Sequence, residues 1–251
     1  MIIKNISKYF IINKLTYLII IISMLMGSFH ILVFITILLV THEMGHFFTA
    51  KILGVRVDKI YIYPFGGISK LDIPVNYSLL KEFIILINGP LIQQITRIVL
   101  ISFFTRYKTI IDSYHYGMLI FNLLPIYPLD GGKLLNILIQ LVRPYKKSLE
   151  ISIIISYICL LFLLLVNISG IKINIILIIF LLIYKIEVER KNINIKYEKL
   201  LLERYINKYK FKDSRIISNI NNFYKNKRHL IKENNKYYLE EEYLSKKYKK
   251  Y

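Results

Sequence analysis

The chain has 251 residues, of which 55% are hydrophobic, and it carries a formal net charge of +19 and a mean hydropathy of +0.47. An ordinary soluble domain of this size is less apolar, so this class is excluded and a membrane protein is indicated. The single cysteine, Cys159, lies in an apolar stretch and excludes an internal disulfide.

Apolar stretches that could cross a bilayer recur along the first 184 residues. They predict an all-α polytopic membrane protein with about six transmembrane helices: Phe10–Met26, Phe29 to about Lys51, Glu82–Phe104, Tyr114 to about Leu129, Leu149–Val166 and Ile173–Tyr184. A cleavable signal peptide is the alternative for the first stretch, although no small-x-small cleavage site follows it. Residues 1–184 then form the membrane domain, and residues 185–251 form a basic cytosolic region.

Lysine and arginine are distributed unevenly between the predicted loops. The N-terminal arm and the connections after the second and fourth spans hold most of them, whereas the opposite loops contain Arg106, Lys108 and Lys172. Because positive charge accumulates on the cytosolic side, we expect both termini and the C-terminal end of the second span to face the cytosol.

The second predicted span carries the sequence His42-Glu43-Met44-Gly45-His46. Histidines four residues apart lie on one side of a helix, where both imidazoles can bind Zn²⁺. The glutamate between them can then act as the general base toward water. A histidine pair satisfied inside a helix bundle is the alternative, but His and Glu at membrane depth are costly and usually functional. The motif therefore predicts a zinc protease that works within a membrane.

The connection after this motif alternates apolar and polar residues, as a β-strand does, from Val55 to Ile62. Pro64-Phe65-Gly66-Gly67 follows, so we expect a short hairpin or a re-entrant piece. Non-helical backbone at membrane depth is tolerated only where protein or a water-filled cavity satisfies it. An ordinary cytosolic loop remains the alternative.

A second irregular segment is expected near the end of the fourth span. Pro125 and Pro128 remove backbone donors and clash with preceding carbonyls, so the helix must unwind there. Asp130 then projects from this break, and the glycines at 131 and 132 permit close backbone approach.

Asp130 is the candidate third metal ligand. A catalytic zinc has three protein ligands and one open position, and His42 and His46 supply two of the three. Asp130 is the ionisable residue that combines the cytosolic end of a span with a helix break. Capping of the following helix, Gly131 to Leu141, is the alternative explanation for an aspartate at this position.

Four segments together resemble the site-2 protease family of intramembrane zinc metalloproteases, most closely its stage IV sporulation protein FB branch. They are the HExxH motif, Pro64–Gly67, Asn88-Gly89-Pro90 and Asn122–Gly132, and the resemblance covers roughly residues 10–205.

The resemblance implies a role for individual residues. His42, His46 and Asp130 match the ligands of one zinc ion per chain, and Glu43 matches the catalytic base. Two further groups match positions that shape the site or border the substrate: Asn122 and Pro128, and the loop residues Phe65, Gly66 and Gly67.

The resemblance also implies a substrate and partners. Enzymes of this branch cleave a membrane-associated precursor of a sporulation sigma factor on the mother-cell side of the forespore outer membrane. Membrane proteins of the same process hold them inactive. We expect a protein substrate and inhibitors of that kind; the oligomeric state is left open.

The C-terminal region departs from that branch. Residues 185–251 contain 19 Lys and Arg against 9 Asp and Glu, and about 60 residues follow Arg190, where the sporulation enzymes carry a CBS domain. We expect either a truncated or divergent CBS-like region or a basic tail on anionic lipid; binding of an acidic substrate is a third reading. A helix is predicted at Lys191–Lys208, and short strands at Arg215–Ile220, His229–Ile231 and Lys236–Leu239.

Three other functional classes fit the sequence less well. One class is a membrane zinc protease whose third ligand is a later glutamate, but this sequence has no suitable glutamate. A non-proteolytic metal-binding scaffold or transporter would also use broken helices. A nucleic-acid-binding membrane anchor would need a reader motif, which the basic tail lacks, so no nucleic-acid partner is expected.

Overall fold

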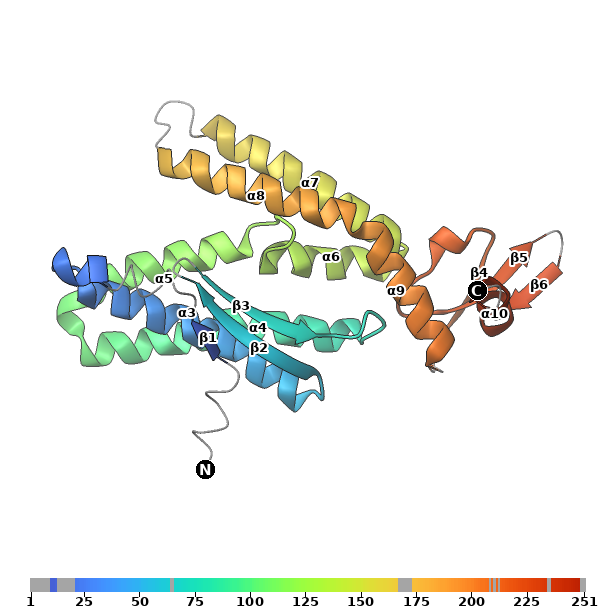
Figure 1. Cartoon of the computed structure of the whole chain (residues 1–251), viewed down its shortest axis with the longest axis horizontal. Coiled ribbons are helices and arrows are strands. Elements are labelled where there is room, and N and C mark those ends of the chain that lie inside the picture. The colour runs from blue at the N-terminus through green and yellow to red at the C-terminus, as the bar shows by residue number, and fades with distance from the viewer. Residues whose placement is uncertain are drawn as a thin grey trace. The chain divides into compact units, whose positions relative to one another are not determined.

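The computed structural model describes residues 10–12, 21–63, 66–166, 173–207, 209, 211, 213–233 and 236–248 (Figure 1). Its contacts divide the chain into two units. The first comprises Met1–Ile73 with Leu80–Phe121, and the second comprises Pro74–Leu79 with Asn122–Tyr251.

The first unit combines long helices with a small sheet. Its elements are β1 (Phe10–Ile12), α3 (Phe29–Ile52), β2 (Arg56–Tyr63), β3 (Gly66–Asp72), α4 (Leu79–Phe103), the 3-10 turn η2 (Thr105–Tyr107) and α5 (Lys108–Leu123). The sheet has the order β1-β2-β3, in which β1 runs parallel and β3 antiparallel to β2. The hairpin predicted after the HExxH motif is therefore confirmed, as β2 and β3.

Close packing of apolar side chains joins the three long helices of the first unit. Phe34 and Leu38 of α3 are buried with Leu100 of α4 and Ile111 of α5. The ring of Phe34 also meets that of Tyr107 at a centroid distance of 5.4 Å. In lipid, where apolar surface gains little from burial, such van der Waals packing is what holds helices together.

Among the described residues, three helices are long and apolar enough to cross a membrane: α3, α4 and α7 (Tyr145–Val166). Only 22–33% of each apolar window is buried inside the protein, so most of its side chains remain to face lipid. The second, third and fifth predicted spans are therefore supported by length and composition.

The other three predicted spans are not confirmed. The first begins as a strand, since Phe10–Ile12 pairs with β2, and residues 13–20 lie outside the described residues. The fourth corresponds to α5, whose 16 residues end at Leu123. The sixth corresponds to α8 (Ile173–Lys191), whose C-terminal third is charged.

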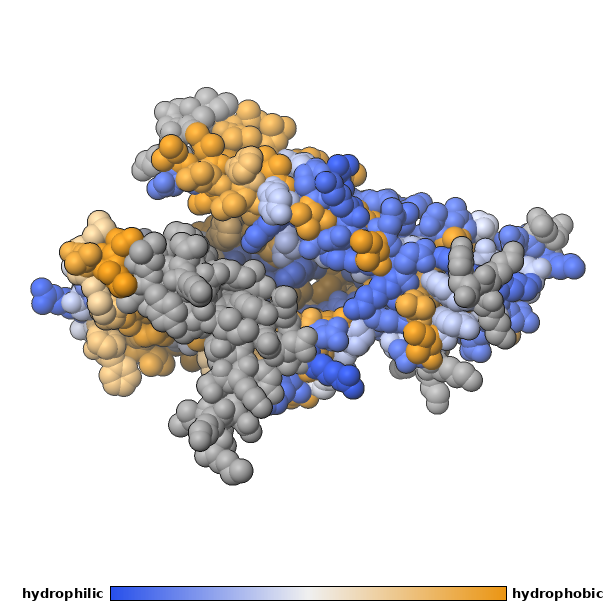
Figure 2. All heavy atoms as spheres, viewed as in Figure 1, coloured by the Kyte–Doolittle hydropathy of each residue, from blue (hydrophilic) through white to orange (hydrophobic). Residues whose placement is uncertain are grey.

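The second unit contains a helical part and a small mixed part. Its further elements are α6 (Asp130–Val142), α7, α8, α9 (Ile193–Ile206), β4 (Ser214–Ile217), the 3-10 turn η4 (Ile220–Asn222), β5 (Arg228–Glu233), β6 (Lys236–Leu239) and α10 (Glu240–Tyr248). In Figure 2 hydrophobic side chains gather along α7 and α8, whereas hydrophilic ones dominate around α9 and the C-terminal strands.

The C-terminal strands form a second three-stranded sheet, β4-β5-β6, with β4 parallel and β6 antiparallel to β5. The predicted helix and all three predicted strands are present, but α10 was not predicted. The chain is mostly helical, as predicted, and it adds two small sheets where alternating apolar residues pair as strands. The division at residue 184 stays a prediction.

Candidate metal centre

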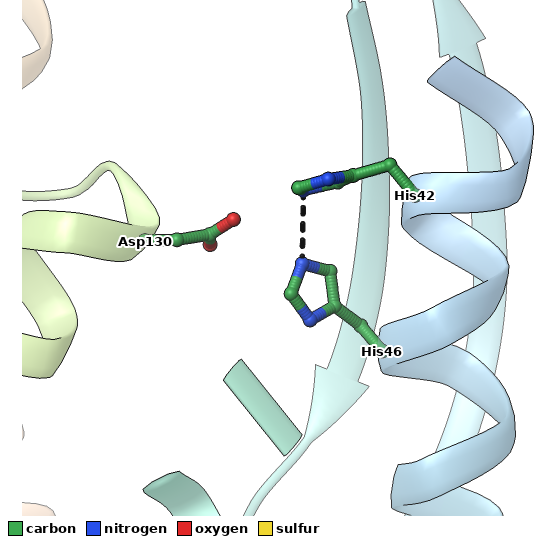
Figure 3. Close-up of side chains that lie close together, drawn as sticks. All are labelled: His42, His46 and Asp130. Atoms are coloured by element: carbon green, nitrogen blue, oxygen red, sulfur yellow. Dashed lines mark hydrogen bonds between the residues drawn. The ribbon is translucent and has the colours of Figure 1, made fainter. Parts of the chain in front are cut away.

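His42 and His46 are presented by one face of α3. They are 1% and 5% exposed, and their rings meet edge to face at a centroid distance of 4.8 Å. Their Nε2 atoms lie 3.1 Å apart, and the dashed line in Figure 3 joins these atoms. The helix continues to Ile52, so the spacing of four residues places both imidazoles on the same side, as the motif predicted.

The partners of the other ring nitrogens fix the chemistry of this pair. His46 Nδ1 lies 2.8 Å from the carbonyl oxygen of Ile85, and His42 Nδ1 lies 2.9 Å from Oε1 of Gln93. Because both oxygens only accept, each Nδ1 carries the proton and each Nε2 presents a lone pair in the neutral ring.

Two lone pairs that face each other at 3.1 Å repel unless a cation lies between them. Tetrahedral zinc, with Zn–N bonds of about 2.0–2.1 Å, separates two imidazole nitrogens by roughly 3.3 Å. The histidine pair therefore fits a zinc ion in both chemistry and spacing.

Two glycines allow α3 and α4 to approach closely enough for this arrangement. A Cβ at Gly89 would overlap the imidazole of His46, and one at Gly45 would lie 2.5 Å from the carbonyl oxygen of Asn88. The sequence did not predict that position 89 must be a glycine, although the Asn88-Gly89-Pro90 motif includes it. Its glycine makes room for the imidazole of His46.

Glu43 follows His42 on α3 and is half-buried. Helix geometry turns it about 100° away from His42 around the axis. This separation suits a residue that acts beside the metal rather than as one of its ligands.

Asp130 is the first residue of α6 in the second unit, and its side chain is only 13% exposed. One of its carboxylate oxygens lies 3.8 Å from the Nζ atom of Lys133. The helix cap is Leu129, and no side chain caps the helix there. Asp130 thus lies in the first turn of α6 rather than at its N-cap position.

The predicted helix break is present between α5 and α6. The segment of residues 124–129 is held by its own turns and by Ser156, whose Oγ accepts the backbone N–H of Tyr127 at 2.8 Å. A Cβ at Gly131 or Gly132 would overlap the backbone of Leu123 or Ile126. The two glycines thus let α6 begin directly against the end of α5.

The remaining predicted site residues lie in these irregular parts or next to them. Asn122 is in the last turn of α5, and Pro128 is half-buried in the break. Gly66 and Gly67 begin β3, opposite Tyr63 and Ile62. Phe65 lies outside the described residues.

The histidine pair belongs to the first unit and Asp130 to the second. Figure 3 draws all three side chains. Each unit supplies one part of a donor set of two imidazoles and one carboxylate, and their union in a single metal centre is a proposal.

The family assignment rests on more than half of the chain. The family model described as peptidase family M50 matches residues 30–118 and 113–166, which include both the HExxH motif and the segment around Asp130. The chain belongs to peptidase family M50. The expected membership in the site-2 protease family is thereby confirmed.

Individual relatives agree with this assignment. Stage IV sporulation protein FB of Bacillus subtilis is 32% identical over 133 residues, which are 50% of this chain and 46% of that protein. A zinc metalloprotease of Methanocaldococcus jannaschii is 31% identical over 176 residues, 66% of this chain and 50% of that one. The chain spans about half the length of these relatives.

A solved structure, the site-2 protease from Methanocaldococcus jannaschii, is similar in fold. It has a TM-score of 0.55 and 26% identity, and the match covers 72% of this chain and 91% of that one. Together with the apolar helices, these matches make the chain an integral membrane protein.

Proposed function

We propose that the chain is an intramembrane zinc endopeptidase of the site-2 type. The observation that carries the proposal is the buried histidine pair on an apolar helix, with the two Nε2 atoms 3.1 Å apart and each Nδ1 beside an oxygen that can accept its proton. Family membership supports the same reading.

One zinc ion is held by His42, His46 and Asp130 in this proposal. The three residues offer one ligand atom each, and the donor set of two imidazoles and one carboxylate suits zinc. Three protein ligands leave one position for reactants, which is the property of a catalytic rather than a structural site.

When bound, zinc would polarise the scissile carbonyl and make water acidic enough to react near neutral pH. Glu43 accepts the proton of the attacking water and then returns it to the leaving amine. His42 and His46 keep their rings fixed through Nδ1, so the site needs little rearrangement during the reaction.

A helical substrate hides its carbonyl groups and must be extended before it is cut. Strand β3 lies at one edge of its sheet, and a peptide added along this edge would be extended by backbone hydrogen bonds. Asn122 and Pro128 at the helix break are proposed to shape the site, and Phe65, Gly66 and Gly67 are proposed to border the substrate.

The proposed substrate is a membrane-associated precursor of a sporulation sigma factor, and the proposed regulators are membrane inhibitor proteins. Similarity to Stage IV sporulation protein FB supports this choice. The distribution of Lys and Arg supports a site and termini that face the cytosol, which would be the mother-cell side of the forespore outer membrane.

The test uses the full chain reconstituted in vesicles with a tagged precursor. Zinc-loaded protein should cut the precursor, and a chelator should stop cleavage until zinc is restored. His42→Ala, His46→Ala and Asp130→Ala should each weaken zinc binding. Normal zinc affinity in the Asp130→Ala protein would remove Asp130 from the ligand set.

A metal-binding scaffold or transporter is not favoured by the family match. The same vesicles distinguish it from a protease. Zinc-dependent metal flux without any cleavage of the precursor would replace the proposed function with transport.

A further inference from the structure

A buried glutamine on α4 connects the histidine pair to α5. Gln93 is 0% exposed, and its Oε1 lies 2.9 Å from His42 Nδ1. Its Nε2 lies 3.3 Å from His115 Nδ1 and 3.4 Å from the carbonyl oxygen of His115. Each end of the amide thus meets a histidine of a different helix.

The contacts of Gln93 decide which way its amide points. The carbonyl of His115 can only accept, so the amide atom beside it must be the NH₂ group. The carbonyl oxygen of Gln93 then necessarily faces His42. In the flipped amide, Oε1 of Gln93 would face the carbonyl oxygen of His115, and the NH₂ group would face Nδ1 of His42.

This orientation selects one tautomer of His42. Because Oε1 accepts, Nδ1 of His42 holds the proton, and its Nε2 is left for a metal. The opposite tautomer would bury Nδ1 against an oxygen with no proton between them, which is unfavourable because two acceptors then face each other.

His115 supports the glutamine from α5. It is 0% exposed, and its Nδ1 accepts from Gln93, so its proton lies on Nε2, which has no hydrogen-bond partner among the described residues. About one turn further along α4, Arg97 pairs with Asp112 of α5 at 2.6 Å and fixes the two helices against each other.

We propose that Gln93 is a positioning residue of the metal centre, with His115 as its support. This inference rests on the proposed zinc function. A neutral amide behind His42 orients the ring without pushing negative charge toward the metal, as a carboxylate would. The centre therefore keeps more of its electrophilic character than a carboxylate–histidine–zinc arrangement.

The test compares neighbouring glutamines of the same helix. Gln93→Met keeps the approximate volume and removes the acceptor, whereas Gln94→Met makes the same change at a partly exposed position without that contact. Zinc affinity, measured by chelator competition in detergent, should fall about 10- to 100-fold in Gln93→Met and stay unchanged in Gln94→Met. Gln93→Glu, which keeps an acceptor, should bind zinc at least as tightly as the unaltered chain.

Unfolding of the metal-free proteins separates positioning from packing. Both substitutions leave buried polar groups unpaired and should lower the unfolding midpoint of the metal-free protein, whereas only Gln93→Met should lose zinc affinity. Zinc affinity lost equally in both variants, or unaltered in Gln93→Met, would overturn the inference. If His42→Ala still loses zinc in the latter case, the proposed function stands while the role of Gln93 falls; if the unaltered chain binds no zinc, both fall.

Discussion

Asn76 and Arg204 are 128 positions apart in the chain, and a hydrogen bond of 2.7 Å joins the arginine Nε to the asparagine Oδ1. Next to it, the carboxylate of Glu203 accepts the backbone N–H groups of Val75 and Asn76 at 3.0 and 3.1 Å. The turn between β3 and α4 is thus held by α9. The C-terminal region is structurally tied to the segment that follows the hairpin.

Arg204 is also the centre of the C-terminal region. Its side chain is 1% exposed, pairs with Glu240 at 3.0 Å, and donates to the carbonyls of Tyr224, Lys225 and Lys227. Removing one member of a buried pair leaves the other charge uncompensated.

Glu240→Gln should therefore destabilise the C-terminal region by about 3–5 kcal/mol. Glu241→Gln is the matched control, because that side chain is 64% exposed and its pair with Arg228 should contribute only about 0–1 kcal/mol. Hydrogen exchange of β5 and of residues 74–79 measures both effects. Equal protection in the two variants would contradict the central role of the Arg204–Glu240 pair.

The stability of this region should depend on pH. His229 Nε2 accepts the N–H of Tyr224 at 2.9 Å, so the ring is held neutral. Burial keeps the pKa of His229 below its ordinary value of 6.5 and outweighs the hydrogen bond to Glu240, which acts in the opposite direction. Burial would raise the pKa of Glu240, but the bond from His229 and the charge of Arg204 leave it below 4.5.

The pKa values of His229 and Glu240 are both lowered in the folded chain. Below pH 6.5 the unfolded chain takes up a proton at position 229 that the folded chain resists, so stability falls as the pH drops from about 7. Below pH 4.5 the loss at Glu240 adds to it. Exchange rates corrected for intrinsic pH effects should show this fall, and His229→Gln should remove its first part. A stability that rises from pH 7 to pH 5.5 would contradict the assignment.

Gly89→Ala should weaken zinc binding, because a Cβ there overlaps the ring of His46. Overpacking of this kind costs about 1–3 kcal/mol, and here the ring must move from its ligand position. Gly117→Ala on α5 is the control, since a Cβ there meets nothing within 4 Å. We expect the zinc affinity of Gly89→Ala to be at least tenfold lower than that of Gly117→Ala. Equal affinities would show that the backbone of α4 moves away and leaves the ring of His46 in place.

The orientation of the chain can be read by cysteine labelling, because Cys159 is the single native thiol. In a Cys159→Ser background, Arg106→Cys should react with an impermeant maleimide in intact cells. Lys81→Cys should react only after lysis, since the Lys and Arg distribution places it on the cytosolic side. The reverse pattern would invert the topology and place the histidines at the wrong face.

Local patterns in the sequence predicted most of the local structure. The HExxH spacing, the alternation after Val55 and the two prolines before Asp130 each determine backbone geometry within a few residues, and the helix, hairpin and break are all present. On the apolar face of α9, Ile193, Tyr197, Leu200 and Leu201 are buried, whereas Tyr205 is 38% exposed and Arg204 is buried in its place.

Long-range partners could not be predicted. Nothing near Phe10 reveals that it pairs with Ile60, and nothing near Arg204 reveals a pocket of carbonyls built by residues 224–227. Gln93 and Gly89 gain their roles only from the packing of α4 against α3. When a distant segment buries a polar residue, the sequence next to that residue does not indicate the burial.

The most direct test of the central claim is Glu43→Gln, which keeps the volume of the side chain and removes the proton acceptor. Zinc content should stay at the level of the unaltered chain, while cleavage of the precursor falls by at least about 10²-fold. Glu150→Gln, an exposed carboxylate on α7, should change neither. Cleavage by Glu43→Gln within tenfold of the unaltered chain, at equal zinc content, would contradict the account.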